Sequence, residues 1–145
     1  MNDKEILANT QLLAENRFIK LLYDAQNEAI ICLPISDLVP TEVFKVFFLL
    51  AADEIKAKNA KRMVFDKRSL RLFDQAAMIW YYVELKPLIK VNTGMITYRK
   101  ILPEDENFRL NVQIGKKFIV QQNPDFQFAD YDIQYVETLS DALIN

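Results

Sequence analysis

The sequence contains no histidine, one cysteine and only two glycines among its 145 residues. The absence of histidine excludes Ser-His-Asp triads and imidazole metal sites, because both need an imidazole ring. The single cysteine, Cys32, excludes an intrachain disulfide and a cysteine-rich zinc site. The two glycines, Gly94 and Gly115, are too few for a glycine-rich phosphate loop. We therefore expect a protein that is not an enzyme and that carries no cofactor and no metal.

The sequence also lacks a strong charge of either sign and a long hydrophobic run. Lys and Arg number 18, Asp and Glu 20, and the net charge of −2 does not favour binding to nucleic acid. The longest apolar run, Val46 to Ala52, has seven residues, whereas a membrane span needs about 20. Residues 1–5 show no basic start followed by an apolar stretch, so we expect no secretory signal and a cytoplasmic location.

What is present is an alternation of strand-like and helix-like segments. Proline is tolerated at the first position of a helix, and Pro40 precedes apolar residues at helical spacing. Asp74 can accept from free backbone N–H groups and so cap a second helix. The expected strands are residues 17–23, 29–33, 61–66, 94–98 and 130–136. The expected helices are residues 40–58, 74 to about 88, 104–123 and 138–144.

This order predicts one α/β domain over residues 17–145, preceded by an N-terminal arm, residues 1–16. Strands separated by single helices imply right-handed crossovers and therefore parallel neighbours. We predict a mostly parallel five-stranded sheet, an N-terminal antiparallel hairpin strand and about four helices.

The segment Val64–Ala77 resembles the signature loop of STAS domains, the anti-sigma-factor antagonists and the cytoplasmic domains of sulfate transporters. In that family a strand ends in an aspartate and a second aspartate starts a helix eight residues later, as Asp66 and Asp74 do here. Residues 135–143 are similar to the strand-to-helix ending of bacterial SpoIIAA-like stand-alone proteins. The resemblance covers nearly all of residues 17–145 and implies a STAS-like fold in a bacterial signalling protein.

One departure from the family concerns phosphorylation. The antagonists carry serine, serine and glycine after the second aspartate, and the first serine accepts phosphate. Here these positions are Gln75, Ala76 and Ala77, which have no hydroxyl group. Ser69 lies nearby, in the middle of the loop. We therefore expect no kinase-controlled switch at the helix start.

A candidate binding site lies where the parallel strands end, since loops and helix N-termini converge there. It could hold an anionic ligand or an acidic segment of a partner; the alternative is a solvated loop in which Asp74 only caps a helix. Residues 56–71 carry a local charge of +6 and residues 118–145 one of −5, which could steer such a partner. The candidate residues are Asp66, Lys67, Arg68, Ser69, Arg71, Asp74, Gln75, Arg99, Lys100, Glu104 and Glu137.

A second candidate surface follows from helices that are apolar on two sides. A helix against a sheet buries one side, so the other side needs a cover. We expect a homodimer or a protein partner there; a neighbouring helix of the same chain is the alternative. The residues on this second side are Val43, Val46, Leu50, Ile79, Tyr82 and Ile89.

Two functions follow. The first is a non-catalytic STAS-like binding or regulatory module that acts through protein–protein interaction. The alternative is a carrier or sensor of a small apolar or anionic ligand, because the STAS-like group resembles the lipid-binding Sec14 architecture. An apolar pocket under the second helix would favour the carrier, and a flat apolar stripe would favour association.

Overall fold

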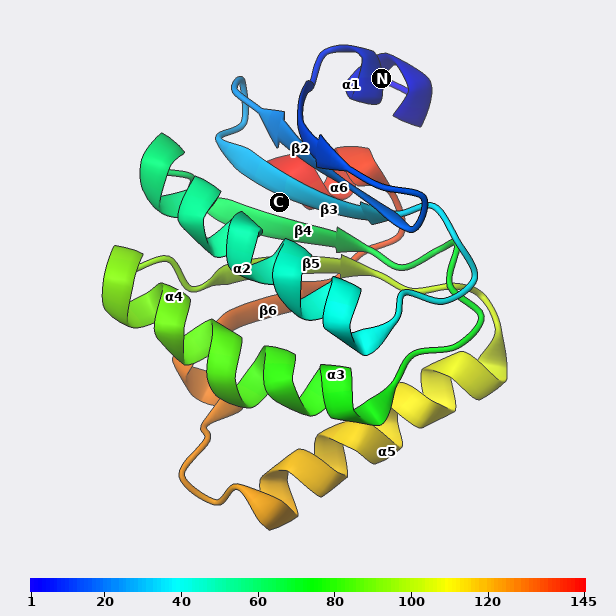
Figure 1. Ribbon diagram of the computed structural model, residues 1–145, viewed down its shortest axis with the longest axis vertical. Helices are drawn as coiled ribbons and strands as arrows, with labels where there is room; N and C mark the ends of the chain where they lie inside the picture. The colour runs from blue at the N-terminus through cyan, green and yellow to red at the C-terminus, as the bar shows by residue number, and fades with distance from the viewer.

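The computed structural model describes residues 1–145, and its centre is one six-stranded sheet with the strands in chain order (Figure 1). The first three strands form an antiparallel meander, and the third to the sixth run parallel. The α/β class and the antiparallel hairpin followed by parallel strands are confirmed, and the sheet has one strand more than predicted. The strands are β1 (Gln11–Glu15), β2 (Ile19–Asp24), β3 (Ala29–Pro34), β4 (Arg62–Asp66), β5 (Thr97–Ile101) and β6 (Asp132–Tyr135).

Helices form each connection between the parallel strands. The helix α2 (Thr41–Lys58) joins β3 to β4, and α5 (Glu106–Gln122) joins β5 to β6. Between β4 and β5 the chain forms one rod that contains α3 (Gln75–Trp80), a π-helical turn (Tyr81–Leu85) and α4 (Lys86–Thr93). The remaining helical segments are α1 (Asp3–Ala8), a 3-10 turn (Phe128–Asp130) before β6, and α6 (Leu139–Ile144).

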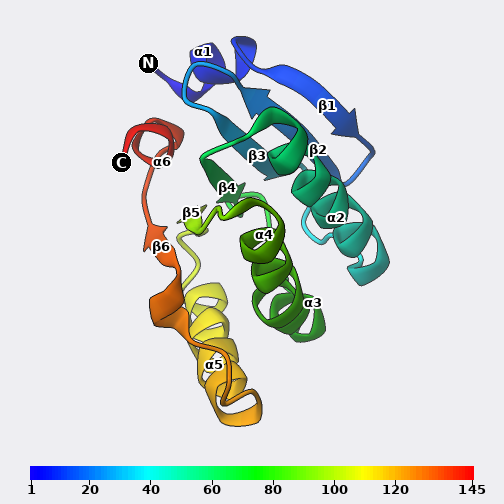
Figure 2. The same cartoon turned by 90° about the vertical axis from the view of Figure 1, so that its left-hand side faces the viewer.

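The connecting helices all cover the same face of the sheet. Parallel strands in chain order, joined by crossovers of one hand, place every crossover helix on one side. Figure 2 shows α2, α3, α4 and α5 together on that side, and α1 and α6 on the other. The strand order never reverses, so the sheet lacks the crevice in which doubly wound sheets bind ligands.

The hydrophobic core has two parts, one on each face of the sheet. On the side of α2 the helical spacing seen in the sequence is confirmed: Phe44, Phe48 and Ile55 are buried, and the Phe44 and Phe48 rings stack at 4.2 Å. The smaller core lies under α1 and α6. It consists of Ile6, Leu22, Ala29, Ile31, Val64, Ile101, Leu139, Ala142 and Leu143.

The structure differs from the sequence-based prediction at two places. Within the predicted arm, residues 11–15 form the edge strand β1, whose residues are exposed or half-buried and so show no alternation of burial. The strand predicted at residues 94–98 lies at Thr97–Ile101 instead. The reason is Gly94, whose φ of 78° ends α4 in the left-handed conformation that glycine adopts without strain.

The second apolar side of the helices also differs from the prediction. Val46 is 63% exposed, as predicted, but Tyr82 and Ile89 are buried, at 0% and 1%. Met78, Tyr82, Leu85 and Ile89 are all buried and recur at the three- and four-residue spacing of a single helix face, so the side that faces the sheet is the one predicted to face outward. Val43, Leu50 and Ile79 are half-buried.

Candidate functional site

Three lysine side chains are buried on the helix-covered face of the sheet. Lys67 follows β4, Lys86 begins α4, and Lys100 lies in β5; each exposes 1% of its surface or less. None of them takes part in a salt bridge, since every ion pair of the protein involves another cation. A buried ammonium group without an acidic partner is strongly destabilising. We call these three side chains the lysine cluster.

Strand geometry places two members of the lysine cluster. Successive side chains of a strand point to opposite faces, so Lys100 shares the helix-covered face with Tyr98 and lies beside Phe65 of β4. Lys67 continues the row of Phe65, and its Nζ lies 4.9 Å from the centre of the Phe65 ring and 4.5 Å from that of Phe73. Both amines are thus surrounded by aromatic rings rather than by water.

The π-helical turn Tyr81–Leu85 places the third lysine. Pro87 has no N–H to donate to the Val83 carbonyl, and its ring would clash with that carbonyl in a regular helix. A wider turn immediately before the proline relieves this conflict. Tyr81 and Tyr82 of this turn and the first residue of α4, Lys86, are all buried on the side that faces the sheet.

The Lys86 amine lies among three tyrosine rings. Its Nζ is 3.4 Å from the centre of the Tyr98 ring, 4.5 Å from that of Tyr81 and 4.8 Å from that of Tyr82. The faces of aromatic rings attract a cation. No atom of the protein forms a hydrogen bond with this Nζ, so its donors are free.

The Lys100 amine has one polar contact, in which it donates to the hydroxyl oxygen of Tyr82. The same Nζ lies 3.9 Å from the centre of the Tyr82 ring and 4.7 Å from that of Tyr81. Because the hydroxyl accepts from the amine, its own proton remains available to a third group. This amine–hydroxyl pair is the most polar point of the lysine cluster.

Burial changes the protonation of the whole cluster. It lowers the pKa of Lys67 to about 7, with a smaller contribution from the charge of Lys116. Burial and the other amines hold the pKa values of Lys86 and Lys100 well below the usual range for lysine. Burial first, and then the neighbouring Tyr135, raises the pKa of Tyr82, which keeps its proton. The cluster can therefore supply neutral amines, or take up protons when an anion enters.

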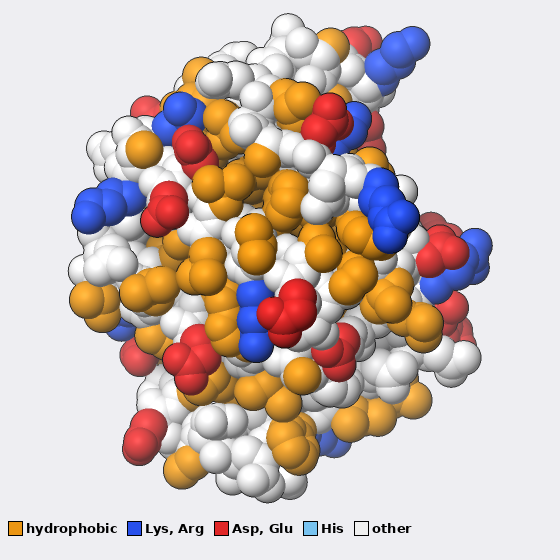
Figure 3. Space-filling model, in the orientation of Figure 1, with side chains coloured by type: hydrophobic (Ala, Val, Ile, Leu, Met, Phe, Trp, Pro, Cys, Tyr) orange, Lys and Arg blue, Asp and Glu red, His pale blue; other side chains and the backbone are white.

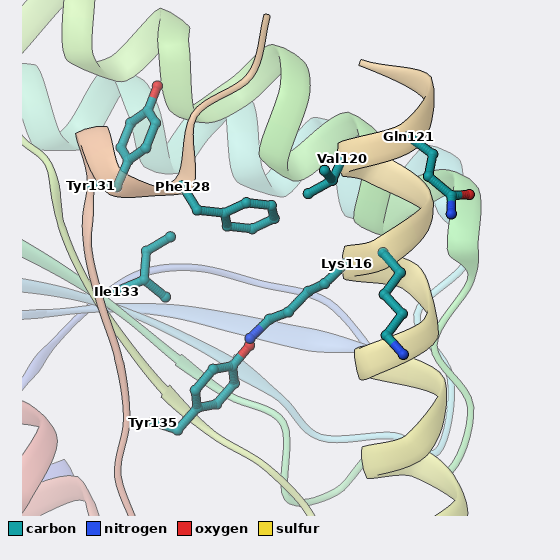
Figure 4. Close-up of a pocket in the computed structure, with 8 residues that line it drawn as sticks. Lys116, Val120, Gln121, Phe128, Tyr131, Ile133 and Tyr135 are labelled. Carbon is teal, nitrogen blue, oxygen red and sulfur yellow. The ribbon is translucent and has the colours of Figure 1, made fainter. Parts of the chain in front are cut away.

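A cavity of about 520 Å³ opens between α5 and β6, next to the lysine cluster. Figure 4 shows that Phe128 and Val120 point into this space, and that Lys116 and Tyr135 extend toward each other across it. The Lys116 Nζ lies 4.1 Å from the centre of the Tyr135 ring. We call this space the α5–β6 cavity. Its lining residues are Lys116, Lys117, Val120, Gln121, Phe128, Tyr131, Ile133 and Tyr135.

Two side chains separate the α5–β6 cavity from the lysine cluster. Tyr135 is the neighbour of Lys100 in the parallel register of β5 and β6, so the two share a face of the sheet. Phe128 packs on the other member of the amine–hydroxyl pair, with its ring centre 5.3 Å from that of Tyr82. Tyr135 is 38% exposed. The Lys100–Tyr82 pair thus lies directly behind Tyr135 and Phe128, which form this part of the cavity wall.

The residues predicted at the 66–75 loop mostly bond to one another or to the nearby backbone. The Asp66 carboxylate accepts from the guanidinium of Arg68, and the same guanidinium binds Asp3 of α1 at 2.7 Å. The Ser69 hydroxyl bridges to the carbonyl oxygens of Pro34 and Ser36. The polar groups that close this loop are therefore used within the protein.

The two residues predicted at the start of the second helix hold helices together. Asp74 caps α3 by accepting from the Ala76 N–H, and it also accepts from the Thr41 hydroxyl at the start of α2. The Gln75 side chain donates to the Asn111 carbonyl of α5 at 3.2 Å. Both line a smaller pocket of about 160 Å³ between α3 and α5.

Arg99 and Lys100 were predicted to lie together in a loop after a strand, and the structure places them elsewhere. Both belong to β5, where neighbours point to opposite faces, so Arg99 lies on the side of α6. There its guanidinium binds the Asp132 carboxylate at 3.0 Å and the Asn145 carbonyl at 2.8 Å. The cause is that β5 begins at Thr97, three residues after the start that the sequence predicted. Of the predicted residues, only Lys67 and Lys100 lie together in the lysine cluster.

Sequence reasoning missed Lys86, Tyr81, Tyr98 and Lys116 as site residues, and it placed Tyr82 on the outer side of its helix. One signal was present: Lys100 follows Tyr98 at the alternate position of a strand that helices cover, and such a position faces the core. A second was Lys86 directly before a proline within a helix, where a kink or a π-helical turn is expected.

Comparisons of the chain with protein-family models, with curated proteins and with solved structures find no match. The STAS resemblance of residues 64–77 therefore stays a prediction. No helix combines the length and the apolar character that crossing a membrane requires. No group of three or more Asp, Glu or Cys side chains lies close enough to hold a metal ion.

Proposed function

We propose that this protein is a binding module, not an enzyme, that holds a small anionic ligand with an apolar body in the α5–β6 cavity. The observation that carries the proposal is the lysine cluster, whose amines lack an acidic partner in the protein. An anion in the cavity would supply the missing charge. The cavity size is that of a small-molecule site, since such sites span about 300–1,000 Å³.

The chemistry of the cavity wall supports the same class of ligand. Phe128 and Ile133 offer apolar surface to the body of a ligand, while Lys116 offers a cation at the end that is nearer the lysine cluster. A ligand with a carboxylate, sulfonate or phosphate group and an apolar remainder would satisfy both. The cavity lies beside α5 and not under the second predicted helix, but its lining supports the carrier or sensor function more than a regulatory module that acts only through protein contacts.

Titration with anilinonaphthalene sulfonate, an apolar dye with one anionic group, tests the proposal. We expect saturable fluorescence that laurate displaces and dodecanol displaces less well. Lys116→Met should weaken binding about tenfold, which corresponds to about 1.4 kcal/mol. Val120→Trp should block binding by filling the cavity. Lys4→Met, on the opposite side of the sheet, is the matched control and should bind as the wild type does. Equal binding by all four proteins would place the dye elsewhere and refute the proposal.

A second candidate function, association with a protein, rests on the outer surface of α2 and α4. Figure 3 shows hydrophobic side chains spread over this helix-covered face. Val46 and Leu49 of α2 and Leu88 and Val91 of α4 are all more than 40% exposed. We call these four residues the α2–α4 patch. We propose that a second copy of the chain binds this patch. We also propose that the fold is STAS-like.

A further inference from the structure

We propose that Lys100 captures its ligand covalently, as an imine with a carbonyl group, so that the ligand is an oxo acid. The inference rests on the proposed function, because the same α5–β6 cavity admits the ligand. It adds that the reacting atom is the Lys100 Nζ and that the ligand belongs to the class of oxo acids.

The position of Lys100 distinguishes it from the other two members of the lysine cluster. Lys100 alone contacts a hydroxyl group, that of Tyr82, and Lys100 alone has a strand neighbour, Tyr135, that lines the cavity. Capture at Lys100 requires the Tyr135 side chain, which is 38% exposed, to turn outward. That movement would open a path from the cavity to the Lys100 Nζ.

The protonation of Lys100 suits a nucleophile. An amine attacks a carbonyl carbon only through its lone pair, and desolvation together with neighbouring cations is the known way to keep a lysine neutral. Lys100 is buried, and the nearby amines of Lys86, Lys67 and Lys116 disfavour its protonation, with no carboxylate among the groups that act on it.

The reaction forms one carbon–nitrogen double bond and releases one water molecule. The Nζ lone pair attacks the carbonyl carbon, and the carbonyl π electrons move to oxygen, which takes a proton from the Tyr82 hydroxyl. Nitrogen returns a proton to Tyr82 to give the neutral carbinolamine. The oxygen then leaves as water, with the second nitrogen-bound hydrogen as its proton. No electrons are gained or lost overall, so no oxidant or reductant is needed.

The carboxylate of the oxo acid would accept hydrogen bonds from amines other than Lys100. Lys86 has free donors, because its Nζ forms no hydrogen bond in the protein. Lys116 reaches across the cavity toward Tyr135 from the other side. A carboxylate next to the carbonyl group would thus hold the carbonyl carbon near Lys100. An aldehyde without an anionic group would lack this anchor.

Reductive trapping tests the inference. The full chain is incubated with pyruvate and cyanoborohydride, and intact mass and peptide mapping follow. We expect one adduct, on Lys100, with a mass gain equal to pyruvate less one oxygen atom. Tyr82→Phe should slow trapping at least tenfold, and Lys100→Met should abolish it. Lys56→Met, on the exposed surface of α2, should be trapped at the wild-type rate, and acetone should be trapped more slowly than pyruvate.

Peptide mapping of the wild type tests the inference even if Lys100→Met fails to fold. An adduct on Lys67 or on surface lysines in place of Lys100 would overturn the assignment. If pyruvate displaces anilinonaphthalene sulfonate but no adduct forms on Lys100, covalent capture is refuted and the proposed function stands. If the dye itself does not bind in the cavity, the proposed function fails as well.

Discussion

At the residue scale, three lysine side chains of this protein contact neither water nor an acidic partner, although a charged lysine usually needs one of the two. Lys67, Lys86 and Lys100 all lie among aromatic rings on the helix-covered face. Apolar residues of similar volume at such positions are usually neutral or stabilising. The lysine cluster therefore lowers the stability of the ligand-free protein, which fits a role in binding rather than in folding.

The first prediction concerns the pH dependence of stability through Lys67. In the unfolded chain a lysine stays protonated up to about pH 10.4, whereas in the folded protein the pKa of Lys67 is about 7. Folding between these values releases a proton, so the free energy of unfolding of the wild type rises with pH across this window. We expect Lys67→Met to be more stable than the wild type at pH 7, and this advantage to shrink by about 1.4 kcal/mol per pH unit up to pH 10.

Urea unfolding followed by circular dichroism at several pH values measures this effect. The groups that face the Lys67 amine are the rings of Phe65 and Phe73 and the amines of Lys86, Lys100 and Lys116, with no carboxylate among them. The exposed Lys4→Met variant serves as control and should keep the wild-type slope. If the stabilities of Lys67→Met and the wild type run parallel with pH, Lys67 is charged in the folded state and the prediction is wrong.

At the scale of elements, local signals decide where the helices begin and end. Asn2, Asp74, Asp105 and Thr138 each cap a helix with a side-chain oxygen, and Gly94 ends α4. Asp74 does more, because it also accepts from the Thr41 hydroxyl and so connects the start of α3 to that of α2. The aspartate that the STAS resemblance singles out therefore has a structural role in this protein.

The second prediction tests that role. We expect Asp74→Ala to lower the free energy of unfolding by about 0.5–2 kcal/mol, the usual cost of losing a helix cap. Asp74→Asn and Asp74→Ser should be closer to the wild type, since both side chains can cap. Chemical denaturation measures all three. Unchanged stability together with loss of binding to a protein partner would contradict this role and favour the binding role that the family resemblance implies.

At the scale of the whole molecule, the sheet with all its crossovers on one face leaves an outer helical surface that nothing in the chain covers. The α2–α4 patch lies on this surface, with Val46 at 63% and Val91 at 83% exposed. A contiguous apolar patch of several hundred Å² is uncommon on a monomer without a partner. The expected dimer therefore uses this patch and not Tyr82 or Ile89, which are core residues.

The third prediction is that the double variant Val46→Glu, Val91→Glu sediments as a monomer under conditions in which the wild type sediments as a dimer. Charges at exposed positions should leave the far-ultraviolet circular dichroism native, whereas Tyr82→Glu should unfold the protein by burying a charge. Gln113→Glu, an exposed change on α5, is the matched control and should stay dimeric. A wild type that is monomeric at every accessible concentration would refute the prediction.

The sequence alone determined most of the elements and little of the site. The helices near 40–58, 104–123 and 138–144 followed from apolar spacing and capping residues, because these act within a few positions of the chain. The spacing also indicated which side of α2 is buried. It did not predict β1, since an edge strand that is half-exposed on both faces has no alternation to detect.

Only the tertiary structure decided which amines lose contact with water. Lys67, Lys86 and Lys100 come from three different elements, and each is an ordinary polar residue in its own stretch of sequence. Their burial depends on how closely α3, α4 and α5 cover the sheet. Periodicity tells which way a side chain points relative to its own element. How much protein lies over it is decided by residues far away in the chain, and so the lysine cluster exists only in the folded protein.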